Sequence, residues 1–228
     1  LAGPGPVTLL YPEWLPGNHA PRGPIDKLAG LRITTPDGTL LPWRRDPVNV
    51  FAFRVDAPAG ARALEIRFQF VSPTQRDQGR IVTTPVMLNL QWNAVVLYPA
   101  GHYARQIRVT PQLTTPAGWT VATALDGARA DGATTRFVTT DLDTLVDSPV
   151  FAGQHAQRID LTPPGAAPVR LTMVADRPYQ LAATPAQIAP HRALIREALA
   201  LFGPGRFDHY EMLLALSDSL GGIGLEHL

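Results

Sequence analysis

Residues 51–56 read Phe-Ala-Phe-Arg-Val-Asp, and residues 64–70 read Leu-Glu-Ile-Arg-Phe-Gln-Phe. Apolar and polar side chains alternate in both stretches, which is the pattern of a strand with one buried face and one solvated face. Shorter alternating stretches lie at residues 31–34, 106–109, 158–161 and 169–174, separated by turn sequences such as Pro36-Asp-Gly38. Strands at this spacing, without helical segments between them, predict a mainly β, antiparallel sandwich or saddle-shaped domain.

Residues 87–99 interrupt this pattern. The alternation holds through Trp92, and a continuous apolar stretch follows it. Either a strand that passes from the edge of a sheet into the interior or a bulge near Asn93 explains the change.

The period of the pattern changes after Asp176. Thr184 is a suitable N-cap with Pro185 at the first helical position, and an apolar face at helical spacing follows: Ile188, His191, Leu194, Ile195, Ala198, Leu199 and Phe202. The pattern predicts a helix over about residues 185–202 and a strand over about 210–216. We therefore expect an antiparallel β domain at residues 1–178, and at residues 179–228 the start of an α/β domain that is cut off.

Composition excludes several classes of protein. Hydrophobic residues make up 45% of the chain and charged residues 17%, which excludes a disordered chain. The 20 Lys and Arg residues are scattered and balanced by 19 Asp and Glu, so we expect no nucleic-acid partner. The sequence has no Cys, and no apolar run approaches the roughly 18 residues of a membrane span. The first residues lack the features of a signal peptide, so we expect any such peptide to have been removed.

The chain offers few residues for catalysis. None of its six histidines has the i,i+4 partner of an H-E-x-x-H motif, so we expect no metal ligand and no catalytic residue in this fragment. We expect His191 to pack on the apolar helix face, His209 to satisfy a corner between helix and strand, and His19 to lie exposed in a loop. None of the four serines lies in a G-x-S-x-G elbow.

A glycine-rich stretch, Gly221-Gly-Ile-Gly224, follows the last predicted strand. It has neither the P-loop motif nor the G-x-G-x-x-G order, so phosphate binding is not expected. Glycines allow the backbone of an extended peptide to approach an edge strand closely, and Glu226 would then place a carboxylate beside that edge.

Several motifs, taken in order, resemble the N-terminal half of the glycyl aminopeptidase family of zinc metallopeptidases. They are Tyr11-Pro-Glu-Trp-Leu-Pro-Gly-Asn-His, Trp43-Arg-Arg-Asp-Pro, Leu90-Gln-Trp-Asn, Val146-Asp-Ser-Pro-Val-Phe-Ala-Gly, and Phe207-Asp-His-Tyr leading to Gly222-Ile-Gly-Leu-Glu-His. The resemblance runs from about Leu10 to the last residue.

This resemblance implies a β domain followed by a thermolysin-like catalytic domain, with zinc in the full-length enzyme and a PDZ domain further on in the same polypeptide. It implies a periplasmic or secreted enzyme that releases small N-terminal residues, Gly or Ala, from peptides. By motif match, Glu226 would bind the free α-amino group of the substrate, and the substrate-binding backbone would be Gly222, Ile223, Gly224 and Leu225. The zinc-binding H-E-x-x-H and the last Glu ligand come later in such proteins.

The alternative function is a non-enzymatic β-sandwich module that binds carbohydrate or a protein partner. Its candidate contacts are the four tryptophans, Trp14, Trp43, Trp92 and Trp119. Large aromatic residues in strands more often belong to a core than to a binding platform.

Overall fold

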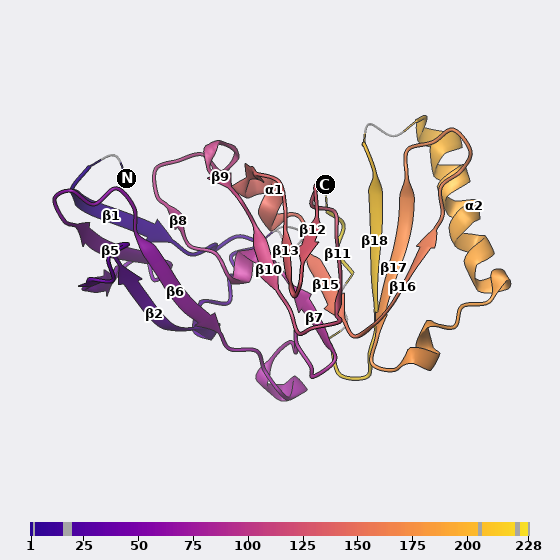
Figure 1. Ribbon diagram of the computed structural model, residues 1–228, viewed down its shortest axis with the longest axis horizontal. Coiled ribbons are helices and arrows are strands. Elements are labelled where there is room, and N and C mark those ends of the chain that lie inside the picture. Colours follow the sequence, from indigo (N-terminus) through magenta and orange to yellow (C-terminus); the bar gives the residue numbers. More distant parts are fainter. Residues whose placement is uncertain (2, 16–19, 205–206, 222–223, 228) are drawn as a thin grey trace.

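The computed structural model describes residues 1, 3–15, 20–204, 207–221 and 224–227 of the chain. Figure 1 shows three groups of elements in a row along the longest axis: an N-terminal pair of sheets, a middle group, and a C-terminal sheet covered by a helix. Each group encloses its own cluster of buried apolar side chains. The described structure is mainly β with largely antiparallel sheets, which confirms the predicted fold class.

The N-terminal group is built on the alternating sequence of residues 51–56. In β5 (Ala52–Ala57), Phe53 and Val55 are 1% and 3% exposed, whereas Arg54 and Asp56 are exposed. Trp43 packs edge-on against Phe53, with 5.4 Å between the ring centroids, and donates its indole N–H to the Leu31 carbonyl. The sheets have the orders β4-β5-β1-β8 and β3-β2-β6, with β1 (Gly5–Leu10), β2 (Leu28–Thr34), β3 (Leu40–Leu41), β4 (Trp43–Arg45), β6 (Glu65–Phe70) and β8 (Tyr98–Pro99), and the 3-10 turn η1 (Ile25–Lys27) precedes β2.

The middle group combines short sheets with one short helix, α1 (Leu142–Val146). Leu142 and Leu145 of α1 are buried in a cluster with Trp92 and Val150. The sheet orders are β11-β15-β7, β10-β13-β12 and β14-β9. Their strands are β7 (Met87–Leu90), β9 (Arg108–Val109), β10 (Gln112–Thr114), β11 (Thr120–Thr123), β12 (Arg129–Asp131), β13 (Thr134–Arg136), β14 (Thr140–Asp141) and β15 (Val150–Gly153), and the 3-10 turns are η2 (Arg76–Gln78), η3 (Trp92–Ala94) and η4 (Ala104–Gln106).

The ambiguous run at residues 87–99 is neither one strand nor a strand with a simple bulge. The strand β7 ends at Leu90, and η3 turns the chain before β8 begins at Tyr98. Trp92 and Asn93, both within η3, are buried. The continuous apolar stretch therefore leaves a buried turn and runs, half-buried, to a strand of the N-terminal group.

The C-terminal group is a three-stranded sheet, β16 (His155–Asp160), β17 (Val169–Ala175) and β18 (Tyr210–Leu216), with the order β16-β17-β18. Strands β17 and β18 are parallel, and the connection between them contains the 3-10 turn η5 (Pro178–Leu181) and helix α2 (Pro185–Phe202). The N-cap Thr184 accepts from the Gln187 N–H, and the Gln187 side chain accepts from the Thr184 N–H. This capping box explains why the helix begins where the sequence predicts.

The apolar face of α2 is narrower than its sequence predicts. Ile188 and Ile195 are each 8% exposed, but Leu194 is 55% exposed and Phe202 is 82% exposed. The helix meets the sheet along one line of side chains, so residues at the margins of the predicted face point away from it. In the described part of the chain, no helix combines the length and the apolar character needed to cross a lipid bilayer.

Strand pairing joins residues on both sides of the predicted division at residue 178. Residues 169–175 pair with residues 210–216, and Leu171 and Met173 share a buried cluster with Ile188 and Ile195 of α2. Without β18 and α2, the strand pair β16-β17 would leave this cluster exposed to solvent. An isolated pair of strands is marginally stable in water. A boundary near residue 154 would keep the C-terminal sheet together.

This pairing predicts the behaviour of two shortened chains. A chain ending at Gln154 should melt cooperatively, whereas in a chain ending at Ala175 trypsin should cleave after Arg158 and Arg170, because both lie on strands that have lost β18 and α2. Mass spectrometry of the digests measures this, with the 228-residue chain as the protected control. Resistance of both sites in the chain ending at Ala175 would contradict the prediction and favour the division at residue 178.

Candidate functional site

The segment after β18 is held at its start by side-chain hydrogen bonds. Ser217 Oγ donates to Asp176 Oδ1 at 3.0 Å, and the Asp218 N–H donates to Asp176 Oδ2 at 2.8 Å. Ser217 Oγ also accepts from the N–H groups of Ser219 and Leu220, each at 3.0 Å. These bonds form a turn that directs the chain from β18 toward the middle group.

The chain then packs against the residues that precede β7. Leu220 is 7% exposed and lies in a cluster with Ile81 and Met87. Gly221 donates its N–H to the Ile81 carbonyl at 3.3 Å. A Cβ at residue 221 would lie 2.9 Å from Arg80 Cγ, so the close approach of the two segments requires glycine here.

The residues predicted to bind substrate follow directly. Gly222 and Ile223 lie outside the described residues. Gly224 and Glu226 are exposed, and Leu225 is half-buried. Among the described residues nothing pairs with Glu226, so its carboxylate is free to meet a ligand.

His227 attaches the end of this segment to the middle group. Its Nδ1 donates to Asp147 Oδ1 at 2.9 Å, and the two side chains are 18% and 16% exposed. Asp147 is the C-cap of α1, and its N–H bonds the Asp143 carbonyl at 3.1 Å. A hydrogen bond largely shielded from water, made at the end of a helix, fixes the backbone from which Glu226 projects.

The other end of α1 is fixed as well. Its N-cap Asp141 accepts from the Thr144 N–H at 2.9 Å, and this bond is the main cause that lowers the pKa of Asp141 below its ordinary value. Ser148 Oγ donates to the Thr144 carbonyl at 2.8 Å, and Ser148 is buried. Hydrogen bonds therefore hold both ends of α1, the helix that Asp147 caps.

Sequence reasoning gave no role to Asp147 or His227, although each lies in a motif of the family resemblance. The motifs are Val146-Asp-Ser-Pro and Gly224-Leu-Glu-His. The two residues are 80 positions apart, so only the fold brings them together. An acidic residue in one motif of the resemblance and a histidine in another are the signal that could have pointed to a contact between the two.

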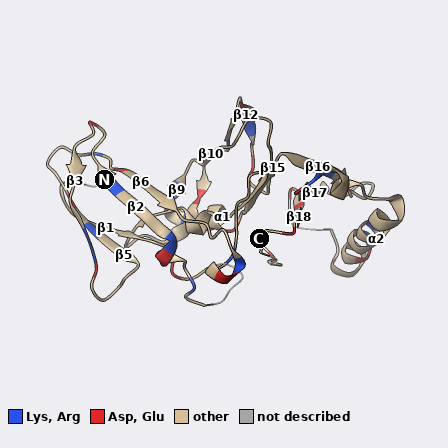
Figure 2. Ribbon diagram, turned by 90° about the horizontal axis from the view of Figure 1, so that it is seen from below, with Lys and Arg blue, Asp and Glu red and all other residues tan. Residues whose placement is uncertain are grey.

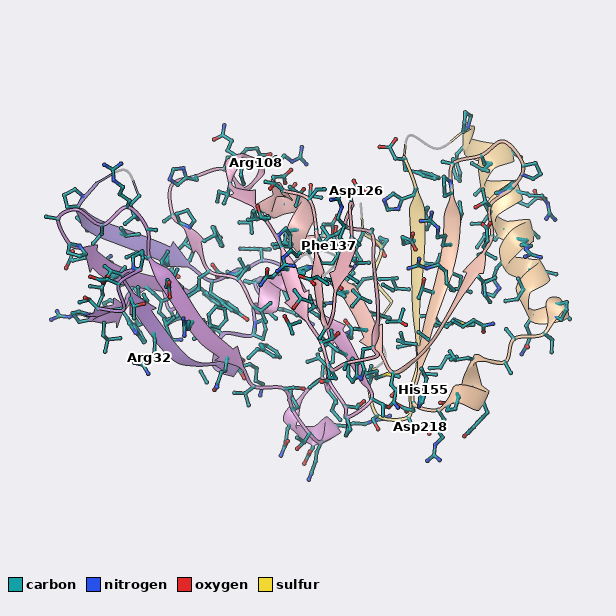
Figure 3. All side chains as sticks on the ribbon, in the orientation of Figure 1. Arg32, Arg108, Asp126, Phe137, His155 and Asp218 are labelled. Atoms are coloured by element: carbon teal, nitrogen blue, oxygen red, sulfur yellow. The ribbon has the colours of Figure 1, made fainter. Side chains whose placement is uncertain are left out.

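Two further histidines, His191 and His209, make contacts within the fold. The sequence predicts that His209 satisfies a local corner, whereas its Nε2 lies 3.0 Å from Asp126 Oδ1, so it joins the start of β18 to the middle group. Figure 3 labels Asp126 and Asp218 at opposite ends of the region where these groups meet. His191 bonds the Gln187 carbonyl within α2, and His19 lies outside the described residues.

Neither metal ligands nor an aromatic platform gather in the described residues. Within them, no group of three or more His, Asp or Glu side chains could hold a metal ion. Of the four tryptophans, only Trp14 is largely exposed, at 64%, whereas Trp43, Trp92 and Trp119 are buried or half-buried. Figure 2 shows basic and acidic residues interspersed along the described chain.

The fold is similar to that of solved peptidase structures. The aminopeptidase N family protein from Idiomarina loihiensis matches with a TM-score of 0.75 and 19% identity, over 97% of this chain and 36% of that chain. An M1 zinc metallopeptidase from Deinococcus radiodurans (TM-score 0.48, 13% identity, 96% of this chain and 51% of that chain) and yeast LTA4 hydrolase (0.47, 14%, 93% and 35%) are more distant. At these identities the likeness concerns the fold alone.

The chain spans about a third of the length of the Idiomarina protein. No curated protein matches the sequence. Residues 2–154, which form the N-terminal and middle groups, match the family described as Peptidase M61 N-terminal domain. Because this match covers well over half of the chain, the chain belongs to the Peptidase M61 N-terminal domain family.

Proposed function

We propose that this chain is the N-terminal part of a zinc-dependent aminopeptidase and that Glu226 binds the free α-amino group of the peptide substrate. The observation that carries the proposal is the match of residues 2–154 to a peptidase family domain. An exposed, unpaired Glu226 on a segment tied down at Gly221 and His227 supports the role of the carboxylate.

The chemistry of Glu226 suits this role. A carboxylate that meets an ammonium in a partly desolvated cleft makes a strong charge-assisted hydrogen bond. The α-ammonium exists only at the first residue of a peptide. The contact would therefore place the first peptide bond at the site of cleavage, so that one residue is released. Gly224 and Leu225, which precede Glu226, offer backbone groups to an extended substrate. On the strength of the family resemblance, we propose that the released residue is Gly or Ala.

Zinc would supply Lewis-acid chemistry for peptide hydrolysis when bound. The described residues do not fit a zinc ion, because no suitable group of ligands occurs among them. We therefore propose that the ligands lie elsewhere in the polypeptide and that residues of this chain bind and orient the substrate. We also propose a PDZ domain in the same polypeptide and a periplasmic or secreted location.

Loss of the Glu226 carboxylate should weaken use of free-amino substrates. In the complete polypeptide, Glu226→Ala should lower kcat/KM by a factor of roughly 30 or more, since truncating one partner of such a pair costs about 2 kcal/mol or more. Glu226→Gln keeps the shape and loses the charge, so its kcat/KM should lie between wild type and Glu226→Ala. Steady-state kinetics on alanyl and glycyl substrates measure these effects.

Two controls accompany the Glu226 variants. An N-acetylated peptide has no ammonium, so its slow cleavage should change little in either variant. Glu197→Ala removes another exposed carboxylate, on α2, and should leave kcat/KM unchanged. Equal losses on free and acetylated peptides would contradict the amine-binding role, because they would indicate a general disturbance of the cleft.

The Asp147–His227 hydrogen bond should position Glu226. In the complete polypeptide, Asp147→Ala and His227→Ala, which each remove one partner of the bond, should each raise KM for free-amino substrates by up to about tenfold with little change in kcat, because a lost hydrogen bond costs about 0.5–1.5 kcal/mol. When either change is combined with Glu226→Gln, the effects should be less than additive, since both act on one contact. Fully additive effects, or a fall in kcat with KM unchanged, would rule out the positioning role.

A further inference from the structure

The turn that follows β18 is bonded to charged side chains from two other parts of the chain. Asp176, the residue after β17, accepts from the Asp218 N–H at 2.8 Å, and Arg76 of η2 donates from Nη2 to the Asp218 carbonyl at 2.6 Å. The two partners lie 42 and 142 positions away from Asp218 in the sequence. Both polar groups of one backbone residue are therefore held, the N–H by an anion and the carbonyl by a cation.

The sheet itself places Asp176. Its N–H donates to the carbonyl of Leu216, the last residue of β18, at 3.0 Å, so Asp176 extends the pairing of β17 with β18. Its second carboxylate oxygen, Oδ1, accepts from Ser217 Oγ at 3.0 Å. Hydrogen bonds to a carboxylate are charge-assisted and stronger than those between neutral groups. The exit of the chain from β18 is therefore fixed relative to the C-terminal sheet.

Arg76 lies in a loop, residues 72–82, that is closed by a hydrogen bond of its own. The Val82 N–H donates to Ser72 Oγ at 3.3 Å. Gly79 has a φ of +126°, which residues with a side chain rarely adopt, so the turn of this loop favours glycine. The loop lies within residues 2–154, the part of the chain that matches the family domain. The cation at the Asp218 carbonyl thus comes from the family domain.

The same loop contacts the turn at two further residues. The Ile81 carbonyl accepts from the Gly221 N–H at 3.3 Å, and the Ile81 side chain shares a buried cluster with Leu220. These contacts follow the chain from its exit at β18 toward Glu226, which is exposed. An exposed side chain takes its position from the backbone that carries it. The placement of Glu226 therefore depends on how firmly the preceding turn is held.

We propose that Arg76 and Asp176 are positioning residues, which hold Asp218 from two sides and thereby place Glu226 for the substrate's α-amino group. The family domain then contributes to substrate affinity through Arg76 without touching the substrate. This inference rests on the proposed role of Glu226, but the hold on Asp218 is measurable without any substrate. The two parts of the inference are therefore tested separately.

Hydrogen exchange of the 228-residue chain, followed by mass spectrometry, tests the hold on the turn. Arg76→Gln and Asp176→Ala should each raise the exchange rates of the amides of residues 218–221 by about threefold or more, because each variant loses charge-assisted hydrogen bonds to the turn. Arg76→Lys should restore most of the protection, since one guanidinium nitrogen makes the contact and an ammonium can replace it.

Two matched variants control for the change of charge. Arg62→Gln and Asp56→Asn each remove an exposed charge in the N-terminal group and should leave the exchange rates of residues 218–221 unchanged. Arg76 is exposed, so its substitution leaves the buried clusters intact, and circular dichroism verifies folding. Unchanged exchange at the turn in folded Arg76→Gln would overturn the proposal.

Steady-state kinetics of the complete polypeptide test the positioning role. Arg76→Gln should raise KM for alanyl and glycyl substrates by about threefold with kcat little changed, and Arg76→Lys should lie close to wild type. Cleavage of the N-acetylated peptide, which has no ammonium, should not change in either variant. A fall in kcat with KM unchanged would indicate a general disturbance and would overturn the positioning role.

The combined results separate this inference from the proposed function. Faster exchange at the turn in Arg76→Gln without a rise in KM, in a polypeptide whose Glu226→Ala variant loses kcat/KM, would overturn the positioning role alone. If Glu226→Ala itself leaves kcat/KM unchanged, the amine contact is wrong and the positioning role falls with it. The exchange rates would then still decide whether Arg76 and Asp176 hold the turn.

Discussion

Contact between the middle group and the C-terminal sheet is the constraint on which the candidate site depends. Met87 on β7 and Val174 on β17 are both fully buried, and Ile81 and Leu220 complete their cluster. Gly153 lies between the first two, and a Cβ there would be 3.4 Å from both Met87 Cβ and Val174 Cβ. Such close packing leaves little freedom for the two sheets to slide. The same packing brings the chain that follows β18 to the middle group, and Figure 1 shows this course of the chain.

Two contacts hold the segment along that path. Arg80 contributes its stem to the contact with Gly221, and its Nε and Nη2 are buried without a hydrogen-bond partner among the described residues. Beyond Gly221, the chain reaches His227, which is bonded to Asp147 at the end of α1. The same packing thus orders the segment that carries Glu226, for which the amine contact is proposed. Residues of the Peptidase M61 N-terminal domain therefore provide the surface on which the following segment is ordered.

Local sequence patterns predicted the elements better than they predicted the contacts between them. The alternation at residues 51–56 and the Thr184 cap act over a few residues, so the strand and the helix could be located from sequence. The buried turn at Trp92 could not, because an apolar run does not distinguish a strand from a turn enclosed by other elements. The bond between His209 and Asp126 also escaped prediction, since it joins residues 83 positions apart. Of the candidate site, the family motif pointed to Glu226, whose amine contact stays a prediction, but only the fold revealed the bond between His227 and Asp147.

The central claim is that Glu226 meets the substrate's α-ammonium, and a crystal structure of the complete polypeptide with a bound peptide tests it most directly. The account predicts the α-nitrogen at about 2.7–2.9 Å from a Glu226 carboxylate oxygen, with the Asp147–His227 hydrogen bond retained. A bound peptide whose ammonium pairs with another group, while Glu226 remains in solvent, would contradict it.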